Sequence, residues 1–590
     1  MKKYINRNYF WSTLFVEKLL NFGVQHVCIS PGSRNTPLTL AFANNKKFKK
    51  YIHIDERASG FFALGIAKKI QNPVVIVTTS GTAVAELYPA IIEAYNQRIS
   101  LIICSADRPA YLRNTGANQT INQENIFQNH IRYFYDFGLP SLEKNDLTNF
   151  CAKIDEGIST GIKINNGPIH FNFPFKKPLE PKTFSDEIIY SIRDFVKDNT
   201  NLNIEHNLIS SQLIYVSNKI KGSQKVSIFC AWDNFEKEFY NELLNFSIKN
   251  NIPIFTDGTS ELRFIKSQNE NIIVNHSAFL QNFTDDAELI LQFGNAPASQ
   301  SVLRYLEDTK AKKILINKFG DLKDPSKSKP LVVENDPVQF LQFLKTQNFN
   351  PENKIDWLKK VIQLDKNSEF IKNSFLQKPK INLEPFWPNE FLKVIPNNSN
   401  LFISNSLPIR DFDYFASKKK SSIKVFTNRG ASGIDGIIST ASGIAAQSKE
   451  NTFLIIGDLA FYHNISALST LAEINISLKI ILLNNNGGGI FNMLPVANEK
   501  NNFEEYFITS QNLDFQKIVK AFGVKYYNPK SWQSFQQNLN SELKSKNSCV
   551  IEIKTDAKKS VELRKKYWSE IEKFLNSPND IKNLQSFHKH

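Results

Sequence analysis

Short apolar runs alternate with helical patterns through the first third of the chain. Apolar runs over residues 26–30, 51–54, 74–79 and 101–105 have the length and composition of buried strands. The segments between them, such as 59–70, repeat their apolar positions with the period of a helix. This alternation predicts a doubly wound parallel sheet.

The same alternation recurs twice further along. A second unit is expected to contain strands over 226–231, 254–256, 289–293 and 313–317, and a third contains apolar runs over 452–456 and 478–483. Proline-rich stretches separate the units. The predicted fold class is α/β, with three doubly wound parallel-sheet domains. The predicted domains are 1–182, 183–350 and 385–590, with a connection over 351–384. Because the central unit has no Gly-x-Gly-x-x-Gly motif, no nucleotide is assigned to it.

Polar side chains follow both apolar runs of the third unit. Gly457 and Asp458 end the first run, and Asn484, Asn485 and Asn486 end the second. The intervening residues leave room for one crossover helix, over about 464–475. If the two strands are parallel neighbours, the Asp458 carboxylate and an asparagine amide meet at one edge of the sheet. These hard oxygen ligands suit magnesium.

Composition narrows the class of protein. The chain has 590 residues, of which 41% are hydrophobic and 12% aromatic, so it is globular. The net charge of +15 comes from dispersed lysines, which favours neither nucleic-acid binding nor membrane insertion. The five cysteines are scattered and most are expected to be core thiols of a reducing compartment. Without a signal peptide or a spanning segment, the predicted location is cytoplasmic. The 560–575 segment is expected to be an amphipathic packing helix.

A strand-to-helix junction in the first unit carries two carboxylates. Asp55 is suited to cap the following helix, and Glu56 falls in its first turn. By itself this arrangement only indicates that Glu56 complements the helix dipole.

The third-unit motif resembles the cofactor motif of thiamine-diphosphate enzymes, although Leu459 stands where glycine is common. The resemblance implies thiamine diphosphate with Mg²⁺, or Mn²⁺ as its substitute, held by Asp458, Asn485 and the Gly487 carbonyl. It places Glu56 against the aminopyrimidine ring, where hydrogen bonding favours the tautomer that accepts a proton. It also implies a homo-oligomer, at least a dimer, with active sites between subunits.

Seven segments in order resemble one family of that class, the 2-succinyl-5-enolpyruvyl-6-hydroxy-3-cyclohexene-1-carboxylate synthases of menaquinone biosynthesis. They are residues 29–38, 79–83, 105–109, 116–119, 405–406, 428–436 and 484–491. The resemblance implies a transferase that decarboxylates 2-oxoglutarate and adds the remaining four-carbon unit to isochorismate.

The resemblance also implies the site residues. As catalytic residues it gives Glu56, Gln119 and Ser33. As substrate-binding residues it gives Arg34, Arg108, Ser406, Arg410, Arg429, Ile490 and Phe491. As cofactor-binding residues it gives Glu56, Ser80, Gly81, Thr82, Ser432, Gly433, Ile434, Gly457, Asp458, Leu459, Asn485 and Gly488. Arginine suits this chemistry because its planar fork binds carboxylates in pairs of hydrogen bonds.

The chain departs from the family pattern in its central unit. Gln300 and Ser301 stand where the family often has a lysine, sometimes followed by an arginine, and Arg304 is a candidate replacement one helical turn away. Two other interpretations of the function are possible from the sequence. One is another thiamine-dependent 2-oxo-acid carboligase or decarboxylase, similar to acetohydroxyacid synthase. The other is a non-catalytic basic binding protein on the same scaffold.

Overall fold

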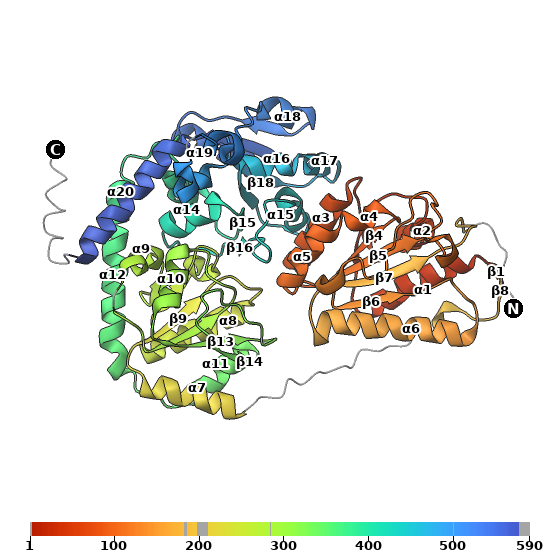
Figure 1. Ribbon diagram of the computed structural model, residues 1–590, viewed down its shortest axis with the longest axis horizontal. Coiled ribbons are helices and arrows are strands. Elements are labelled where there is room, and N and C mark those ends of the chain that lie inside the picture. The colour runs from red at the N-terminus through yellow and green to blue at the C-terminus, as the bar shows by residue number, and fades with distance from the viewer. Residues whose placement is uncertain (1–2, 182–185, 197–209, 284, 500, 577–590) are drawn as a thin grey trace.

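The protein is described by a computed structural model that covers residues 3–181, 186–196, 210–283, 285–499 and 501–576. It contains three six-stranded sheets, and every strand pairing inside them is parallel. Helices cover the sheets, so the predicted α/β class with three parallel sheets is confirmed (Figure 1). A separate antiparallel pair joins β1 (Lys3–Ile5) to β8 (Asp186–Ile188).

The first sheet has the strand order β3-β2-β4-β5-β7-β6. Its strands are β2 (His26–Ile29), β3 (Lys49–Ile52), β4 (Val74–Thr78), β5 (Leu101–Asp107), β6 (Tyr133–Asp136) and β7 (Ile169–Pro174). Both β4 and β5 are buried along their whole length, as expected for central strands of a covered parallel sheet. The helices packed around it are α1 (Arg7–Asn21), α2 (Thr36–Asn44), α3 (Glu56–Ile70), α5 (Tyr88–Asn96) and α6 (Lys144–Ser159).

The central sheet has a different order, β11-β10-β9-β12-β13-β14. Its strands are β9 (Val226–Cys230), β10 (Ile254–Thr256), β11 (Ile272–Ile273), β12 (Leu289–Phe293), β13 (Lys312–Asn317) and β14 (Leu331–Glu334). The surrounding helices include α7 (Ser210–Gly222), α8 (Lys237–Asn250), α10 (Gln300–Asp308) and α11 (Pro337–Lys345). The long helix α12 (Ile355–Phe375) leads out of this domain.

The third sheet has the order β16-β15-β17-β18-β20-β19. Its strands are β15 (Asn400–Ile403), β16 (Lys424–Phe426), β17 (Thr452–Gly457), β18 (Leu478–Asn484), β19 (Lys525–Tyr527) and β20 (Cys549–Lys554). The main helices are α14 (Leu407–Phe415), α15 (Ile437–Ala446), α16 (Asp458–His463), α17 (Leu468–Glu473), α19 (Trp532–Glu542) and α20 (Ala557–Asn576). The crossover helix predicted over about 464–475 is present as a short 3₁₀ turn (Ile465–Ala467) followed by α17, and α16 precedes it.

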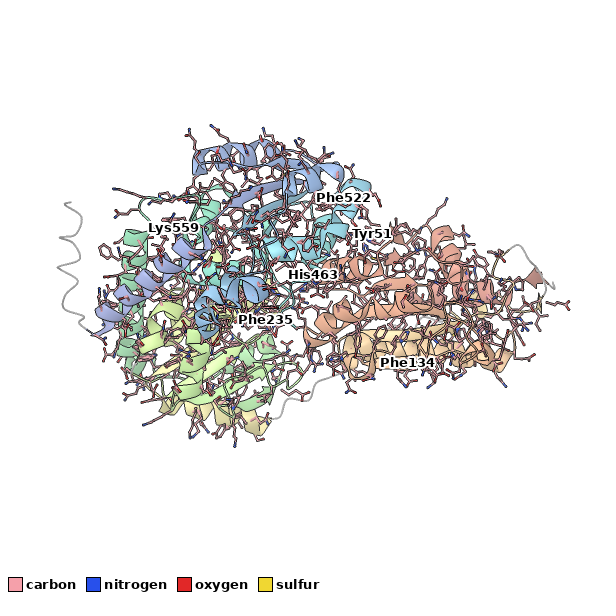
Figure 2. All side chains as sticks on the ribbon, turned by 45° about the horizontal axis from the view of Figure 1, so that its top comes forward. Tyr51, Phe134, Phe235, His463, Phe522 and Lys559 are labelled. Carbon is pink, nitrogen blue, oxygen red and sulfur yellow. The ribbon has the colours of Figure 1, made fainter. Side chains whose placement is uncertain are left out.

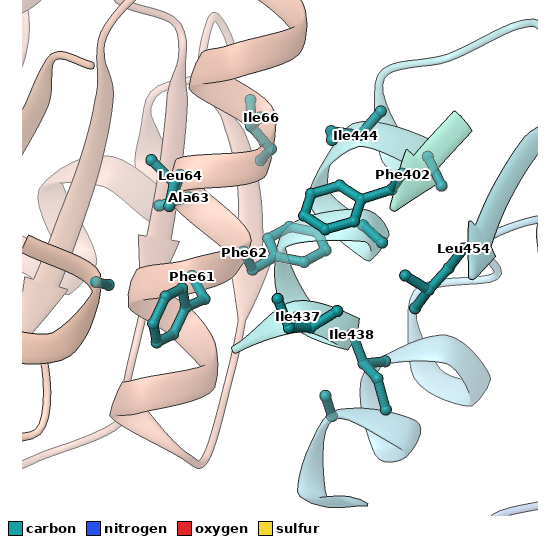
Figure 3. Packing of buried hydrophobic residues seen from close by; sticks show 14 of the residues in the cluster. Phe61, Phe62, Ala63, Leu64, Ile66, Phe402, Ile437, Ile438, Ile444 and Leu454 are labelled. Atoms are coloured by element: carbon teal, nitrogen blue, oxygen red, sulfur yellow. The ribbon is translucent and has the colours of Figure 1, made fainter. Parts of the chain in front are cut away.

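The first and third domains share one hydrophobic core. Helix α3 packs directly on α15, and the apolar cluster between them includes Phe62, Ile437 and Ile444 (Figure 3). Gly65 and Gly443 allow this close approach, because a Cβ on Gly443 would lie 2.1 Å from the Phe62 carbonyl oxygen. Tyr51 accepts a hydrogen bond from Gln447 in the same interface, and Figure 2 places Tyr51 and His463 near this junction.

Several expectations about the scaffold can be compared with the structure. All five cysteines are free and buried, which confirms the core thiols. Helix α20 buries Val561, Tyr567 and Ile571, which confirms the packing helix. Within the described part of the chain, no helix is both long and apolar enough to cross a bilayer. The domain boundaries remain predictions, and the one after residue 182 lies outside the described residues.

Candidate active site

The carboxyl ends of the third-sheet strands surround a cavity of about 170 Å³. Ten of the predicted site residues line it. They are Ser406, Ile434, Gly457, Asp458, Leu459, Asn485, Gly487, Gly488, Ile490 and Phe491. Adjacent parallel strands β17 and β18 carry the two polar ends, as the sequence predicted.

Asp458 is 6% exposed and begins α16 at the end of β17. Its Oδ1 accepts a hydrogen bond from the Leu459 amide at 2.9 Å, and its Oδ2 accepts one from the Gly487 amide at 2.7 Å. Burial raises the pKa of Asp458 to about 7, although both amides oppose the rise. At neutral pH, a cation can displace the proton of a buried carboxylate with this pKa and bind in its place.

The Asn485 side chain supplies a second oxygen. Its Nδ2 donates to Glu384 Oε1 at 2.6 Å, while its Oδ1 is buried and has no hydrogen-bond partner among the described residues. An unpaired buried carbonyl oxygen and a carboxylate that line one cavity suit a hard divalent cation. The residues therefore fit a magnesium–diphosphate group, with Asp458, Asn485 and the Gly487 carbonyl as the candidate ligands.

The loop after β18 requires glycine for its close packing. Gly487 has a φ of +141°, and a Cβ there would lie 2.2 Å from the Ile508 carbonyl oxygen. The Gly488 amide donates to that same carbonyl at 2.7 Å. The backbone of this loop is thus fixed at one wall of the cavity.

Two predicted arginines, Arg410 and Arg429, do not line the cavity but contact residues that do. Arg410 Nη1 donates to the Ser406 carbonyl at 2.7 Å, and Arg429 Nη1 lies 3.5 Å from Asn405 Oδ1. Burial lowers the pKa of both guanidinium groups; the charge of Arg429 lowers that of Arg410 further, whereas Asp257 and Glu93 oppose the lowering at Arg429. Both stay charged, because the ordinary value lies far above neutral pH. Ser406 (φ 72°) and Ser432 (φ 61°) adopt left-handed conformations, a local strain that often marks functional sites.

The first-domain residues form a second cluster, at the carboxyl ends of β2, β4 and β5. The Arg108 guanidinium donates to the Ser80 hydroxyl, and Arg34 Nη1 donates to the Phe175 carbonyl at 2.8 Å. Gly81 has a φ of +90°, and a Cβ there would lie 3.3 Å from Gln119. Ser33, Thr82 and Gln119 are exposed at the surface of this cluster, whereas Ser80 and Gly81 are buried beneath it.

Glu56 is the first residue of α3, as predicted. Asp55 caps the helix by accepting from the Ala58 amide at 3.0 Å, and its other oxygen accepts from Ser466 of the third domain at 2.7 Å. Burial raises the pKa of Glu56 above its ordinary value. Glu56 is not among the residues that line the third-domain cavity, and neither are the Arg34 and Arg108 side chains.

Hydrogen bonds from the first domain hold the loop that carries Arg429, Ser432 and Gly433. The Glu93 carboxylate accepts from the amides of Gly430 at 2.8 Å and Ala431 at 2.6 Å. Lys68 Nζ donates to Asn428 Oδ1 at 2.8 Å, and burial lowers the pKa of Lys68 to about 7. The contact between the two outer domains therefore fixes a segment of the site.

Sequence reasoning missed three carboxylates near the site. Glu384 and Asp411 line the cavity, and Glu93 holds the 428–433 segment. Glu384 was placed in the proline-rich connection, and Asp411 and Glu93 lie in ordinary amphipathic helices, so no local pattern distinguished them. In the central domain, Gln300 and Arg304 lie on α10 with exposed side chains, and neither lines the cavity.

Comparison with known proteins gives the class. The family described as thiamine pyrophosphate enzyme, N-terminal TPP binding domain, matches residues 11–126. The corresponding C-terminal TPP binding domain matches residues 414–553. Fold and site together define a thiamine-diphosphate-dependent enzyme of the transferase type.

Curated relatives give the family. A protein of Trichodesmium erythraeum (strain IMS101) is 36% identical over 93% of this chain and 96% of its own length. Proteins of Bacillus cytotoxicus and Oceanobacillus iheyensis are each 32% identical, over 96% and 95% of this chain and 97% of their own lengths. All three are named 2-succinyl-5-enolpyruvyl-6-hydroxy-3-cyclohexene-1-carboxylate synthase, and the chain belongs to that family.

Proposed function

We propose that this enzyme decarboxylates 2-oxoglutarate and adds the resulting four-carbon unit to isochorismate, giving 2-succinyl-5-enolpyruvyl-6-hydroxy-3-cyclohexene-1-carboxylate and CO₂ for menaquinone biosynthesis. The observation that carries the proposal is that one cavity, in a chain of this family, is lined by both the buried carboxylate Asp458 and Asn485, whose side-chain oxygen has no hydrogen-bond partner among the described residues. Thiamine diphosphate, when bound, supplies the carbon nucleophile and the electron sink that decarboxylation of a 2-oxo acid requires.

The cation site is part of the proposal. Asp458, Asn485 and the Gly487 carbonyl would hold Mg²⁺, or Mn²⁺ in its place, against the diphosphate. Leu459, Gly457 and Gly488 would supply the backbone around it, and Ile434 would support the cofactor from below. Ser80, Gly81, Thr82, Ser432 and Gly433 complete the proposed cofactor-binding set.

Glu56 is the proposed proton-handling residue. Its raised pKa makes the carboxyl group more able to hold a proton against the aminopyrimidine ring at neutral pH. Ser33 and Gln119 would orient the substrate through hydrogen bonds. Ile490 and Phe491 wall the cavity and would keep water away from the reacting carbon.

The arginines are the proposed carboxylate receptors. Both substrates are dicarboxylates, and the chain offers Arg34 with Arg108 in the first domain and Arg410 with Arg429 in the third. Buried or half-buried guanidinium groups bind carboxylates more strongly than exposed ones, because water competes less.

The test is substrate-dependent turnover by the purified protein with thiamine diphosphate and Mg²⁺. Loss of isochorismate that requires 2-oxoglutarate, and not pyruvate, is expected. Turnover of pyruvate in preference to 2-oxoglutarate would favour an enzyme similar to acetohydroxyacid synthase. Failure to bind thiamine diphosphate in a calorimeter would favour a non-catalytic basic binding protein.

Assembly and location are also proposals. We expect a cytoplasmic homo-oligomer, at least a dimer, with active sites between subunits. Co-assembly of Glu56→Gln and Asp458→Asn chains tests this, since random pairing of dimers would regenerate about a quarter of the wild-type sites. No regained activity would instead favour a site made within one chain, where α3 already contacts α15.

A further inference from the structure

A buried hydrogen-bond network joins the cavity to the last helix of the described chain. Arg564 on α20 is 1% exposed and donates from Nη2 to Glu384 Oε2 at 2.6 Å and to Asp411 Oδ2 at 2.6 Å. Its Nε donates to Asp411 Oδ1 at 2.7 Å. Glu384, itself 2% exposed, uses its other oxygen to accept from Asn485 Nδ2 at 2.6 Å.

This network determines which way the Asn485 amide faces. Glu384 Oε1 accepts from the amide nitrogen Nδ2, so the nitrogen side of the amide faces Glu384. The amide oxygen is then turned the other way, and this Oδ1 is buried without a hydrogen-bond partner among the described residues, in a residue that lines the same cavity as Asp458. A neutral partner such as glutamine could both donate and accept, and it would permit either orientation.

Arg564 holds Glu384 in this position. A guanidinium group can only donate hydrogen bonds, and Arg564 occupies Glu384 Oε2, which leaves Oε1 to accept from Asn485 Nδ2. Burial raises the pKa of the other partner, Asp411, to about 6, and Arg564 limits that rise.

We propose that Glu384 and Arg564 are positioning residues for the cation ligand Asn485. Helix α20 would then contribute to the cofactor site through Arg564. Neither residue is proposed to touch the cation, the cofactor or the substrate. The inference rests on the proposed cation site, and it adds to that site the residues that orient one of its ligands. Outer-shell partners of metal ligands commonly change metal affinity about 10- to 100-fold when they are replaced.

The experiment measures Mn²⁺ binding by electron paramagnetic resonance, in the full-length protein with saturating thiamine diphosphate. Glu384→Gln is expected to weaken Mn²⁺ binding about 10- to 100-fold. The substitution keeps the shape of the side chain and leaves the bonds from Arg564 to Asp411 in place, which favours folding. Arg564→Lys, which keeps the charge but loses the two-armed geometry, is expected to weaken binding in the same direction by a smaller factor.

Two controls separate positioning from a general loss of stability. Asp324→Asn disturbs the buried Lys313–Asp324 pair of the central domain, in which both side chains are 1% exposed, and should leave Mn²⁺ affinity within about twofold of wild type. In an Asn485→Ala background, Glu384→Gln should change the affinity by less than about threefold, because the ligand that it orients is gone.

The outcomes are distinct. If the wild-type protein binds Mn²⁺ and Glu384→Gln binds it equally well, the inference is wrong and the cation site stands. A full loss that persists in the Asn485→Ala background would also overturn it, because Glu384 would then act by another route. If the wild-type protein itself binds no Mn²⁺, the proposed cation site fails, and the inference fails with it.

Discussion

The first and third domains share one topology and differ in what they place at the same edge of the sheet. In both sheets the order, counted along the chain from β2 and from β15, is 2-1-3-4-6-5, whereas the central sheet has the order 3-2-1-4-5-6. The helices that follow the second strand of each outer sheet, α3 and α15, pack on each other (Figure 3). One fold has thus been used twice, and the chemistry differs only in the strand-end loops.

The difference lies in charge. After its third strand the first domain has the buried, uncharged Ser80 and Gly81, and the third domain has Gly457 and the buried carboxylate of Asp458 at the cavity. The helix after the second strand begins with Glu56 in one domain and follows the 428–436 loop in the other. We infer that the first domain handles protons and the third holds the charged end of the cofactor.

Removing the proton-handling group should have the largest effect. Glu56→Gln should lower kcat by about 10²- to 10⁴-fold, the usual contribution of a general acid or base, while thiamine diphosphate still binds. Isochorismate consumption and calorimetric binding measure the two quantities. Turnover within tenfold of wild type would remove Glu56 from this role.

Removing the buried carboxylate should act on binding instead. Asp458→Asn should weaken Mg²⁺-dependent binding of thiamine diphosphate by more than about 100-fold, because a direct ligand costs more than an outer-shell partner. Asn540→Ala, at an exposed position of α19 in the same domain, is the matched control. Equal affinity of the Asp458 variant and wild type would contradict the assigned cation site.

The carboxylate receptors should act on substrate affinity. Arg429→Ala and Arg410→Ala should each raise a substrate KM by about 10- to 100-fold, the size expected from losing a charged hydrogen bond. Arg304→Ala, on an exposed face of α10, should leave KM unchanged unless it replaces the missing central-domain cation. Steady-state kinetics with each substrate varied in turn assigns the arginines.

The pH dependence of cation binding should follow Asp458. Its pKa of about 7 in the folded protein lies above the ordinary value of 3.8. Protons then compete with the cation below pH 7, and Mg²⁺ affinity should fall about tenfold for each pH unit from 7 towards 5. The stability of the metal-free protein has the opposite pH dependence. The protonated Asp458 side chain contributes stability at low pH, and that contribution is lost as the pH rises through 7. Affinity independent of pH over this range would show that Asp458 is not the ligand.

Adding a single methyl group at the contact between the outer domains should lower the stability of the protein. Gly443→Ala would place a Cβ 2.1 Å from the Phe62 carbonyl and should destabilise the protein by about 1–3 kcal/mol through overpacking. Gly222→Ala is the matched control, since a Cβ there meets nothing within 4 Å. Equal thermal unfolding of the two variants would contradict the close crossing of α3 and α15.

Much of the scaffold was predictable, because apolar periodicity reports burial directly. The strands that follow the pattern most cleanly, such as β10 and β12, begin and end where they were expected. The cap at Asp55 was also foreseen, since capping is a local interaction. The identical strand order of the two outer sheets was not predictable, because strand order depends on contacts between distant segments.

The candidate site was predictable only where its residues belong to strand-end motifs. Asp458 and Asn485 were found because adjacent strands deliver them to one place. Glu384 and Arg564 are 180 residues apart, and their pairing arises only when α20 folds back on the third sheet. No pattern within either segment indicates such a partner.

The experiment to perform first is isochorismate consumption by the purified protein with thiamine diphosphate, Mg²⁺ and 2-oxoglutarate, alongside Glu56→Gln and Asp458→Asn. The division of labour between the outer domains predicts turnover that needs both substrates and is lost in both variants, with cofactor binding retained in Glu56→Gln and lost in Asp458→Asn. Turnover that survives in either variant, or cofactor binding that both variants lose equally, would contradict it.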